Sequence, residues 1–104
     1  MKQSRFQNPT GMRDILPEDQ RYFNRIYKVV SEIASFYDFE KIETPILEYV
    51  DVFEKGTGES TDIVKKEMYS FKTKGGDVLA LRPEYTPGVM RSYIQNGMQN
   101  KPQP

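Results

Sequence analysis

A glycine-containing turn between two runs of β-forming residues constrains the fold of this chain more than any other feature. Thr73–Gly76 separates Glu67–Lys72 from Asp77–Leu81. Glycines at such a turn can adopt positive φ, and β-forming runs on both sides of it are typical of a hairpin. The pattern therefore predicts two antiparallel strands.

A helix is expected directly after this hairpin. Thr86 is a suitable N-cap, Pro87 a suitable first helical residue and Gly97 a suitable end. Apolar residues with helical spacing lie between them: Val89, Met90, Tyr93 and Ile94. The pattern predicts a helix over residues 87–96, so that a strand meets a helix at a corner formed by Leu81–Gly88.

A longer amphipathic helix is predicted from Pro17. Glu18 and Asp19 place negative charge in its first turn, where the helix dipole favours it. Its apolar residues recur at steps of three and four: Tyr22, Phe23, Ile26, Tyr27, Val29, Val30, Ile33, Ala34, Phe36 and Tyr37. Only 37% of the chain is hydrophobic and it has no cysteine, so we expect a thin core without disulfides, and a helix that packs against more protein.

The segment after this helix has the alternation of a strand. Phe39–Glu43 alternates apolar and charged residues, Pro45 interrupts, and Ile46–Val50 resumes with β-forming residues. We expect a strand, a break, and a second strand or extended segment. Proline cannot donate to a ladder, so Pro45 suits a sheet edge or a bend, although a proline in an ordinary loop also fits. Residues 54–62 read as a loop whose glycines lack the spacing of a phosphate-binding turn.

The composition excludes several classes of function. Fifteen basic and fifteen acidic residues cancel, so the chain lacks the positive charge of a free-standing nucleic-acid binder. No eighteen apolar residues run together, so we expect no membrane association and a cytoplasmic location. The absence of histidine and cysteine excludes the common zinc sites and nucleophilic catalysis by a thiolate or a histidine-activated group. No metal-binding residue is expected.

Glu84, at the corner between strand and helix, is the residue best suited to ligand binding. A carboxylate held at a rigid strand end can receive an ammonium group, and the Thr86 hydroxyl can add a second contact. A purely structural alternative also fits: Arg82 can form an ion pair with Glu84 while Thr86 only caps the helix. The residues leave both interpretations open.

Three ordered segments resemble the N-terminal part of histidyl-tRNA synthetases: Pro9–Pro17, Asp62–Tyr69 and Leu81–Glu84. The resemblance covers almost the whole chain. It implies an α+β fold, an antiparallel sheet flanked by helices, as part of a class II aminoacyl-tRNA synthetase catalytic domain. Residues 1–104 would then form one piece of that domain, with these parts: a lead-in over 1–16, a helix and motif 1 region over 17–53, a loop over 54–66, and a hairpin with the substrate-side strand and helix over 67–98.

The resemblance also implies what the parent protein does. Histidyl-tRNA synthetases are homodimers that activate histidine with ATP and Mg²⁺ and transfer it to tRNA. In that family Glu84, Tyr85 and Thr86 match substrate-side positions that bind histidine, and Pro45 matches the proline of the dimer-forming motif. The family usually has glycine at the position of Tyr85 and often alanine at that of Pro87, so the substrate-side surface is expected to differ here.

The resemblance implies no catalytic residue within these 104 residues. The chain is expected to stop before the arginine that grips the ATP α-phosphate, the histidine-specific segment, motif 3 and the anticodon-binding domain. Without a cation on the transferring phosphate, the isolated chain is expected to be inactive. The same segments also resemble the regulatory subunit of ATP phosphoribosyltransferase, a non-catalytic protein of histidine biosynthesis. A self-standing dimerisation module is a third alternative.

Overall fold

A computed structural model describes residues 5–56 and 66–103 of the chain. These residues belong to two compact units, residues 1–40 and residues 41–104. Most of the loop expected over 54–66 lies outside the described residues, as do parts of the Asp62–Tyr69 segment.

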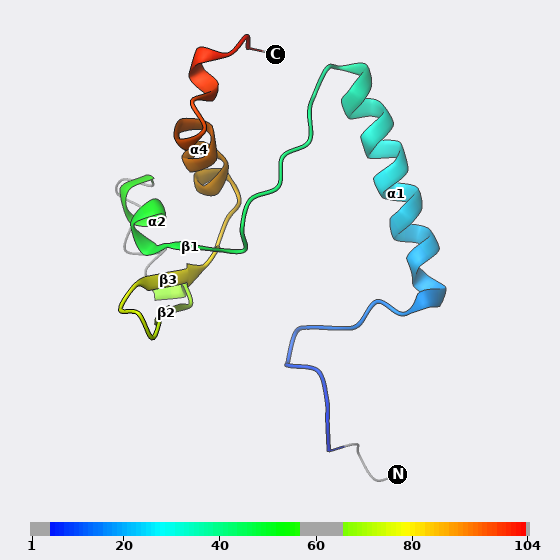
Figure 1. Ribbon diagram of the computed structural model, residues 1–104. Coiled ribbons are helices and arrows are strands. Elements are labelled where there is room, and N and C mark those ends of the chain that lie inside the picture. The colour runs from blue at the N-terminus through cyan, green and yellow to red at the C-terminus, as the bar shows by residue number, and fades with distance from the viewer. Residues whose placement is uncertain (1–4, 57–65, 104) are drawn as a thin grey trace. The chain divides into compact units, whose positions relative to one another are not determined.

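The first unit consists of a lead-in and one long helix. Residues 5–16 contain a turn but no helix or strand. Helix α1 runs over Pro17–Phe36 with Pro17 at its start and acidic residues in its first turn, as the sequence predicts (Figure 1). It ends before Asp38, whose φ of 63° lies in the left-handed region. No residue of α1 is buried, and apolar residues such as Tyr27 and Ile26 are 68% and 58% exposed.

The second unit is built on a three-stranded antiparallel sheet. Its strands β1 (Leu47–Tyr49), β2 (Ser70–Lys72) and β3 (Val78–Leu81) lie in the order β1-β3-β2. The predicted hairpin is therefore confirmed, because β2 and β3 are neighbours joined by a tight turn. In that turn Gly76 has a φ of 96°, which other residues rarely adopt. The amide of Thr73 donates to the carbonyl of Asp77 at 2.7 Å and closes it.

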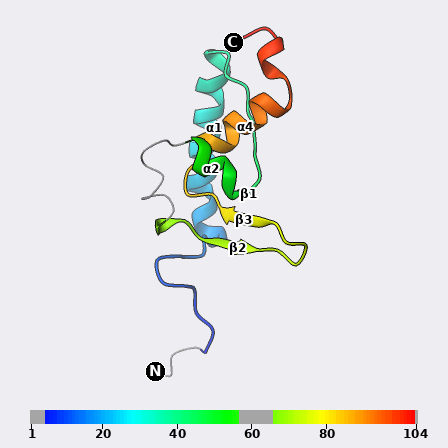
Figure 2. The same cartoon turned by 90° about the vertical axis from the view of Figure 1, so that its left-hand side faces the viewer.

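Two helices cover one face of this sheet. Helix α2 (Val50–Gly56) contacts β1, β3 and helix α4 (Thr86–Gln95), and both helices lie on the same side of the strands (Figures 1 and 2). Phe53 of α2 and Ala80 of β3 are fully buried beneath them. The core of the described residues is limited to these two apolar side chains, which agrees with the thin core expected from composition.

The opposite face of the sheet is apolar and open. Paired residues of an antiparallel sheet share a face, and neighbours along a strand alternate between faces. The register pairs Glu48 with Ala80 on the helix-covered side, so these residues lie on the other side: Leu47, Tyr49, Phe71, Leu79 and Leu81. Of these, Tyr49 is 57% exposed and Phe71 47%.

Two expectations from the sequence about residues 39–56 are wrong. Residues 39–45 form no strand, because alternation alone does not make a strand without a neighbouring strand to pair with. The strand or extended segment expected over Ile46–Val50 is confirmed as strand β1, although Val50 already belongs to α2. The loop expected from residue 54 does not begin there, because residues 54–56 belong to α2, which packs against α4 and the sheet.

The helix expected over 87–96 is confirmed as α4, followed by Gly97 at a φ of 62°. Thr86 is not its N-cap, however. The cap position belongs to Tyr85, and no side chain caps this helix. Thr86 instead forms part of the first turn, because Tyr85 already has helical φ and ψ. A short 3₁₀ helix, η2 (Met98–Asn100), follows and was not expected.

Candidate functional site

Arg82 at the strand–helix corner holds the segment that leads into β1. Its Nη1 donates to the carbonyl oxygens of Thr44 at 3.1 Å and Pro45 at 3.5 Å. Its guanidinium also lies over the ring of Tyr85, 4.5 Å from the ring centre. Among the described residues Arg82 forms no ion pair with Glu84. The alternative in which Arg82 pairs with Glu84 is therefore wrong, because backbone carbonyls and an aromatic ring engage the guanidinium instead.

Tyr85 folds back toward the same segment. The amide of Thr44 donates to the Tyr85 hydroxyl at 3.4 Å. This hydrogen bond lowers the pKa of the Tyr85 phenol below its ordinary value, and the nearby Arg82 charge acts in the same direction. Arg82 and Tyr85 thus fix the corner against residues 44–45, which precede edge strand β1. Pro45 itself is exposed and stands two residues before that edge strand.

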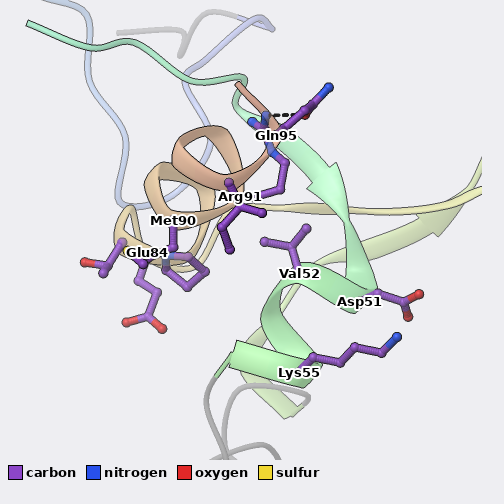
Figure 3. Close-up of a pocket in the computed structure, with 10 residues that line it drawn as sticks. Asp51, Val52, Lys55, Glu84, Met90, Arg91 and Gln95 are labelled. Carbon is purple, nitrogen blue, oxygen red and sulfur yellow. Dashed lines mark hydrogen bonds between the residues drawn. The ribbon is translucent and has the colours of Figure 1, made fainter. Parts of the chain in front are cut away.

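An open cavity of about 720 Å³ lies between α2 and α4. Glu84 lines it just before α4, and α2 supplies Val52 and Lys55 (Figure 3). Thr86, the first residue of α4, lines it as well. The other lining residues are Asp51, Pro87, Met90, Arg91, Ile94 and Gln95. Tyr85 does not line this cavity. Of the three residues proposed for ligand binding, the structure brings Glu84 and Thr86 to one cavity and turns Tyr85 toward Thr44.

Glu84 carries an exposed carboxylate with no ion pair among the described residues. It stands beside a largely apolar wall that includes Pro87 and Met90. A carboxylate at the edge of such a wall can receive a ligand's cationic group while the rest of the ligand lies on apolar surface. The geometry is thus compatible with the ligand role that the sequence suggests.

An ion pair between a buried carboxylate and a residue of the cavity wall was not predicted. Glu48 of β1 is 6% exposed, and it accepts hydrogen bonds from Arg91 of α4 at 2.6 Å and 3.1 Å. Arg91 also donates to Gln95 at 2.9 Å, within α4 (Figure 3). The sequence carries a weak signal for this pair, because Glu48 interrupts an otherwise apolar stretch of strand. No spacing rule connects it with a helical arginine 43 residues later.

Gly88 allows α4 to approach β1 closely at this pair. It is buried, and a Cβ atom on it would lie 3.3 Å from Oε1 of Glu48 and 3.3 Å from Oγ1 of Thr44. Such distances are shorter than ordinary van der Waals contacts of a methyl group. The Oγ1 of Thr44 is buried and has no hydrogen-bond partner among the described residues.

The described residues offer no metal site and no membrane span. No group of three or more acidic, histidine or cysteine side chains in residues 5–56 and 66–103 could hold a metal ion. Within those same ranges, no helix combines the length and apolar character needed to cross a bilayer.

The chain is similar to proteins of one enzyme class. These proteins are aminoacyl-tRNA synthetases, and a solved member shares the fold. The apo histidyl-tRNA synthetase of Staphylococcus aureus superposes with a TM-score of 0.78 at 39% sequence identity. The match covers 95% of this chain and 23% of the Staphylococcus aureus chain. The expected α+β class, with an antiparallel sheet flanked by helices as part of a class II synthetase catalytic domain, is therefore confirmed. The model of the histidyl-tRNA synthetase family matches residues 11–103. The chain belongs to that family.

Individual relatives agree. A histidine–tRNA ligase of Dehalococcoides mccartyi is 46% identical over 99 residues, covering 95% of this chain and 24% of the relative. A Bacillus halodurans structure described as an ATP phosphoribosyltransferase regulatory subunit/histidyl-tRNA synthetase has a TM-score of 0.72 at 28% identity, covering 99% of this chain and 26% of its own. The chain thus spans about a quarter of the length of the proteins it matches.

Proposed function

We propose that these 104 residues serve as part of a histidine–tRNA ligase, which activates histidine with ATP and transfers it to tRNA. Family membership over residues 11–103 supports the reaction. The observation that carries the local role is that Glu84 and Thr86 line one open cavity at the start of α4. In this proposal the chain supplies the surface that receives histidine.

The Glu84 carboxylate is proposed to receive the α-ammonium group of histidine. It is exposed and free of ion pairs among the described residues, so a ligand does not have to displace a protein cation. The Thr86 hydroxyl adds a neutral hydrogen bond. Tyr85 does not line the cavity, and it is proposed to border the histidine site from the corner, where Arg82 and Thr44 hold it.

The other parts of the ligase function are proposed with it. We propose ATP and tRNA as the co-substrates. We also propose that the ligase is a homodimer with Pro45 at its interface, and that it is located in the cytoplasm. Mg²⁺ accompanies ATP in such a reaction, but the described residues contain no cluster that fits a metal ion. We therefore assign no step through Mg²⁺ to this chain. We also expect the isolated chain to show no histidine-dependent ATP–pyrophosphate exchange, and exchange in a clean preparation would contradict this.

The decisive experiment is Glu84→Gln in the complete ligase. The change keeps the shape of the side chain and removes its charge, so histidine binding should weaken by about 1.5–3 kcal/mol, the scale of a charge-assisted hydrogen bond. ATP affinity should stay nearly unchanged. Calorimetry with each ligand measures both, and Glu43→Gln is the matched control because Glu43 is an exposed carboxylate paired with Lys41 at 2.9 Å. An unchanged histidine affinity in Glu84→Gln would refute the role.

The second candidate is the regulatory subunit of ATP phosphoribosyltransferase. The Bacillus halodurans structure favours it specifically, since its description names both proteins. Charging assays separate the two: a ligase attaches histidine to tRNA, whereas a regulatory subunit does not and instead binds a phosphoribosyltransferase catalytic subunit.

A further inference from the structure

We propose that Glu48 and Arg91 are positioning residues for the histidine site. The pair fixes the middle of α4 against β1 while the Glu48 carboxylate lies close to Gly88 in the first turn, and together these contacts set where Glu84 and Thr86 stand at the cavity. This inference rests on the proposed function, because it assigns to the pair a role at that same site. Neither residue is proposed to contact the reacting atoms.

The geometry of the pair suits positioning. Two nitrogens of Arg91 donate to the two carboxylate oxygens of Glu48, at 2.6 Å and 3.1 Å, and this bidentate arrangement fixes orientation as well as distance. Glu48 is 6% exposed. A buried ion pair is weak support for stability, since apolar residues of the same size often stabilise as much. Its better-supported use is to select one arrangement of the elements it joins.

The close approach at Gly88 ties the helix start to the pair. Gly88 lies in the first turns of α4, two residues after Thr86 and four after Glu84. The space where its Cβ would lie is bounded by the Glu48 carboxylate and by Thr44, each 3.3 Å away. The carboxylate thus lies close to the first turn of α4, and we expect a shift of it to move the backbone that carries Thr86 and Glu84.

The other end of the pair borders the same cavity. Arg91 lines the cavity together with Glu84 and Thr86, and its hydrogen bond to Gln95 holds the guanidinium along α4. One strand residue thus controls a helix face that forms the cavity wall. Ligand groups must be held within roughly 0.5 Å of their productive places, so a small movement of this wall should affect histidine.

The test is a double-mutant cycle in the complete ligase with Glu48→Gln and Glu84→Gln. If Glu48 acts through Glu84, Glu48→Gln should raise the histidine KM about tenfold alone but less than about twofold in the Glu84→Gln background. The KM for ATP should change less than about twofold in every variant. Glu43→Gln, an exposed carboxylate outside the site, should leave both constants unchanged.

A second variant covers the case in which Glu48→Gln does not fold. Gly88→Ala adds a methyl group against Glu48 and Thr44, while alanine favours a helix more than glycine does. A raised histidine KM with an undiminished Tm would be a positional effect and would support the proposal. If Glu48→Gln cannot be purified, an unchanged histidine KM in Gly88→Ala would overturn the positioning proposal.

The remaining outcomes separate this inference from the proposed function. An equal rise of the histidine KM in both backgrounds, or a lower Tm with an unchanged KM, would overturn the positioning role and leave the ligase function intact. If Glu84→Gln itself leaves the histidine KM unchanged, the proposed role of Glu84 fails. The positioning role of the pair is then tested by a double-mutant cycle of Glu48→Gln with Thr86→Val. Additive effects of these two changes on the histidine KM would overturn that role.

Discussion

Removal of the Arg91 guanidinium should strongly destabilise the second unit. In Arg91→Met the Glu48 carboxylate, which is 6% exposed in the original chain, loses both of its hydrogen bonds from Arg91. Breaking a buried pair in this way typically costs about 3–5 kcal/mol. The Arg91 side chain is 28% exposed beside an open cavity, so water can partly solvate the carboxylate and we expect about 3 kcal/mol, the lower end of that range.

That loss is large for a unit of this size. Stabilities of about 0.05–0.15 kcal/mol per residue give roughly 3–10 kcal/mol for residues 41–104. Glu48→Met with Arg91→Met removes both charges and leaves no buried carboxylate. The double variant should therefore lie within about 1 kcal/mol of the original chain and be more stable than Arg91→Met alone.

Native-state hydrogen exchange is the appropriate assay. It measures the opening free energy of β3 and α4 amides separately from those of α1, whereas circular dichroism would mix the two units. A loss below about 1 kcal/mol in Arg91→Met would refute the reasoning, because an uncompensated buried carboxylate must cost more than that. A double variant as unstable as the single one would refute it as well.

Three further predictions concern the segment before β1. Arg82→Lys keeps the charge but loses the planar fork that reaches the Thr44 carbonyl and covers Tyr85. Hydrogen exchange at the amides of Thr44 and Ile46 should therefore show a loss of about 1 kcal/mol in opening free energy. The hydrogen bond from Thr44 and the Arg82 charge lower the pKa of Tyr85 in the folded chain. The original chain should therefore gain stability relative to Tyr85→Phe as pH rises from about 8 to 11. If chemical denaturation gave both chains the same pH dependence of stability, this prediction would be contradicted. The pKa of the Glu43 carboxyl is lowered by a hydrogen bond from Lys41 and by its charge, so Lys41→Met should raise that pKa in an NMR titration, and an unchanged value would count against the ion pair.

Local signals in the sequence were sufficient for much of the fold. Pro17 with its acidic first turn predicts α1, the glycine turn predicts the β2–β3 hairpin, and the Pro87 to Gly97 interval predicts α4. Each depends on residues within a few positions of one another, where backbone preferences act directly. The helix α2 could not be predicted in this way, because its seven residues are too few to specify a helix without the contacts that α4 and the sheet provide.

The site was only partly accessible from the sequence. Glu84 and Thr86 follow a strand and open a helix, so their proximity is a local property and the structure brings both to one cavity. The partners of Arg82 and Glu48 lie 38 and 43 residues away in sequence. Hydrophobic periodicity and residue spacing do not predict contacts between residues that are so far apart in sequence. The sequence therefore suggested an ion pair between Arg82 and Glu84, because these opposite charges lie close together in sequence. The structure does not form that pair.

The unequal faces of the sheet show why one ion pair matters so much here. The helix-covered face buries Ala80 and Glu48, with Phe53 of α2 as the one large apolar side chain that is fully buried among the described residues. The open face keeps Tyr49 and Phe71 about half exposed. Apolar residues are thus present, but in this chain they contribute little to holding the helices on the sheet. Since so little apolar packing fixes α4, the Glu48–Arg91 contact has to define its position, and a change there should move the helix rather than be absorbed by a surrounding core.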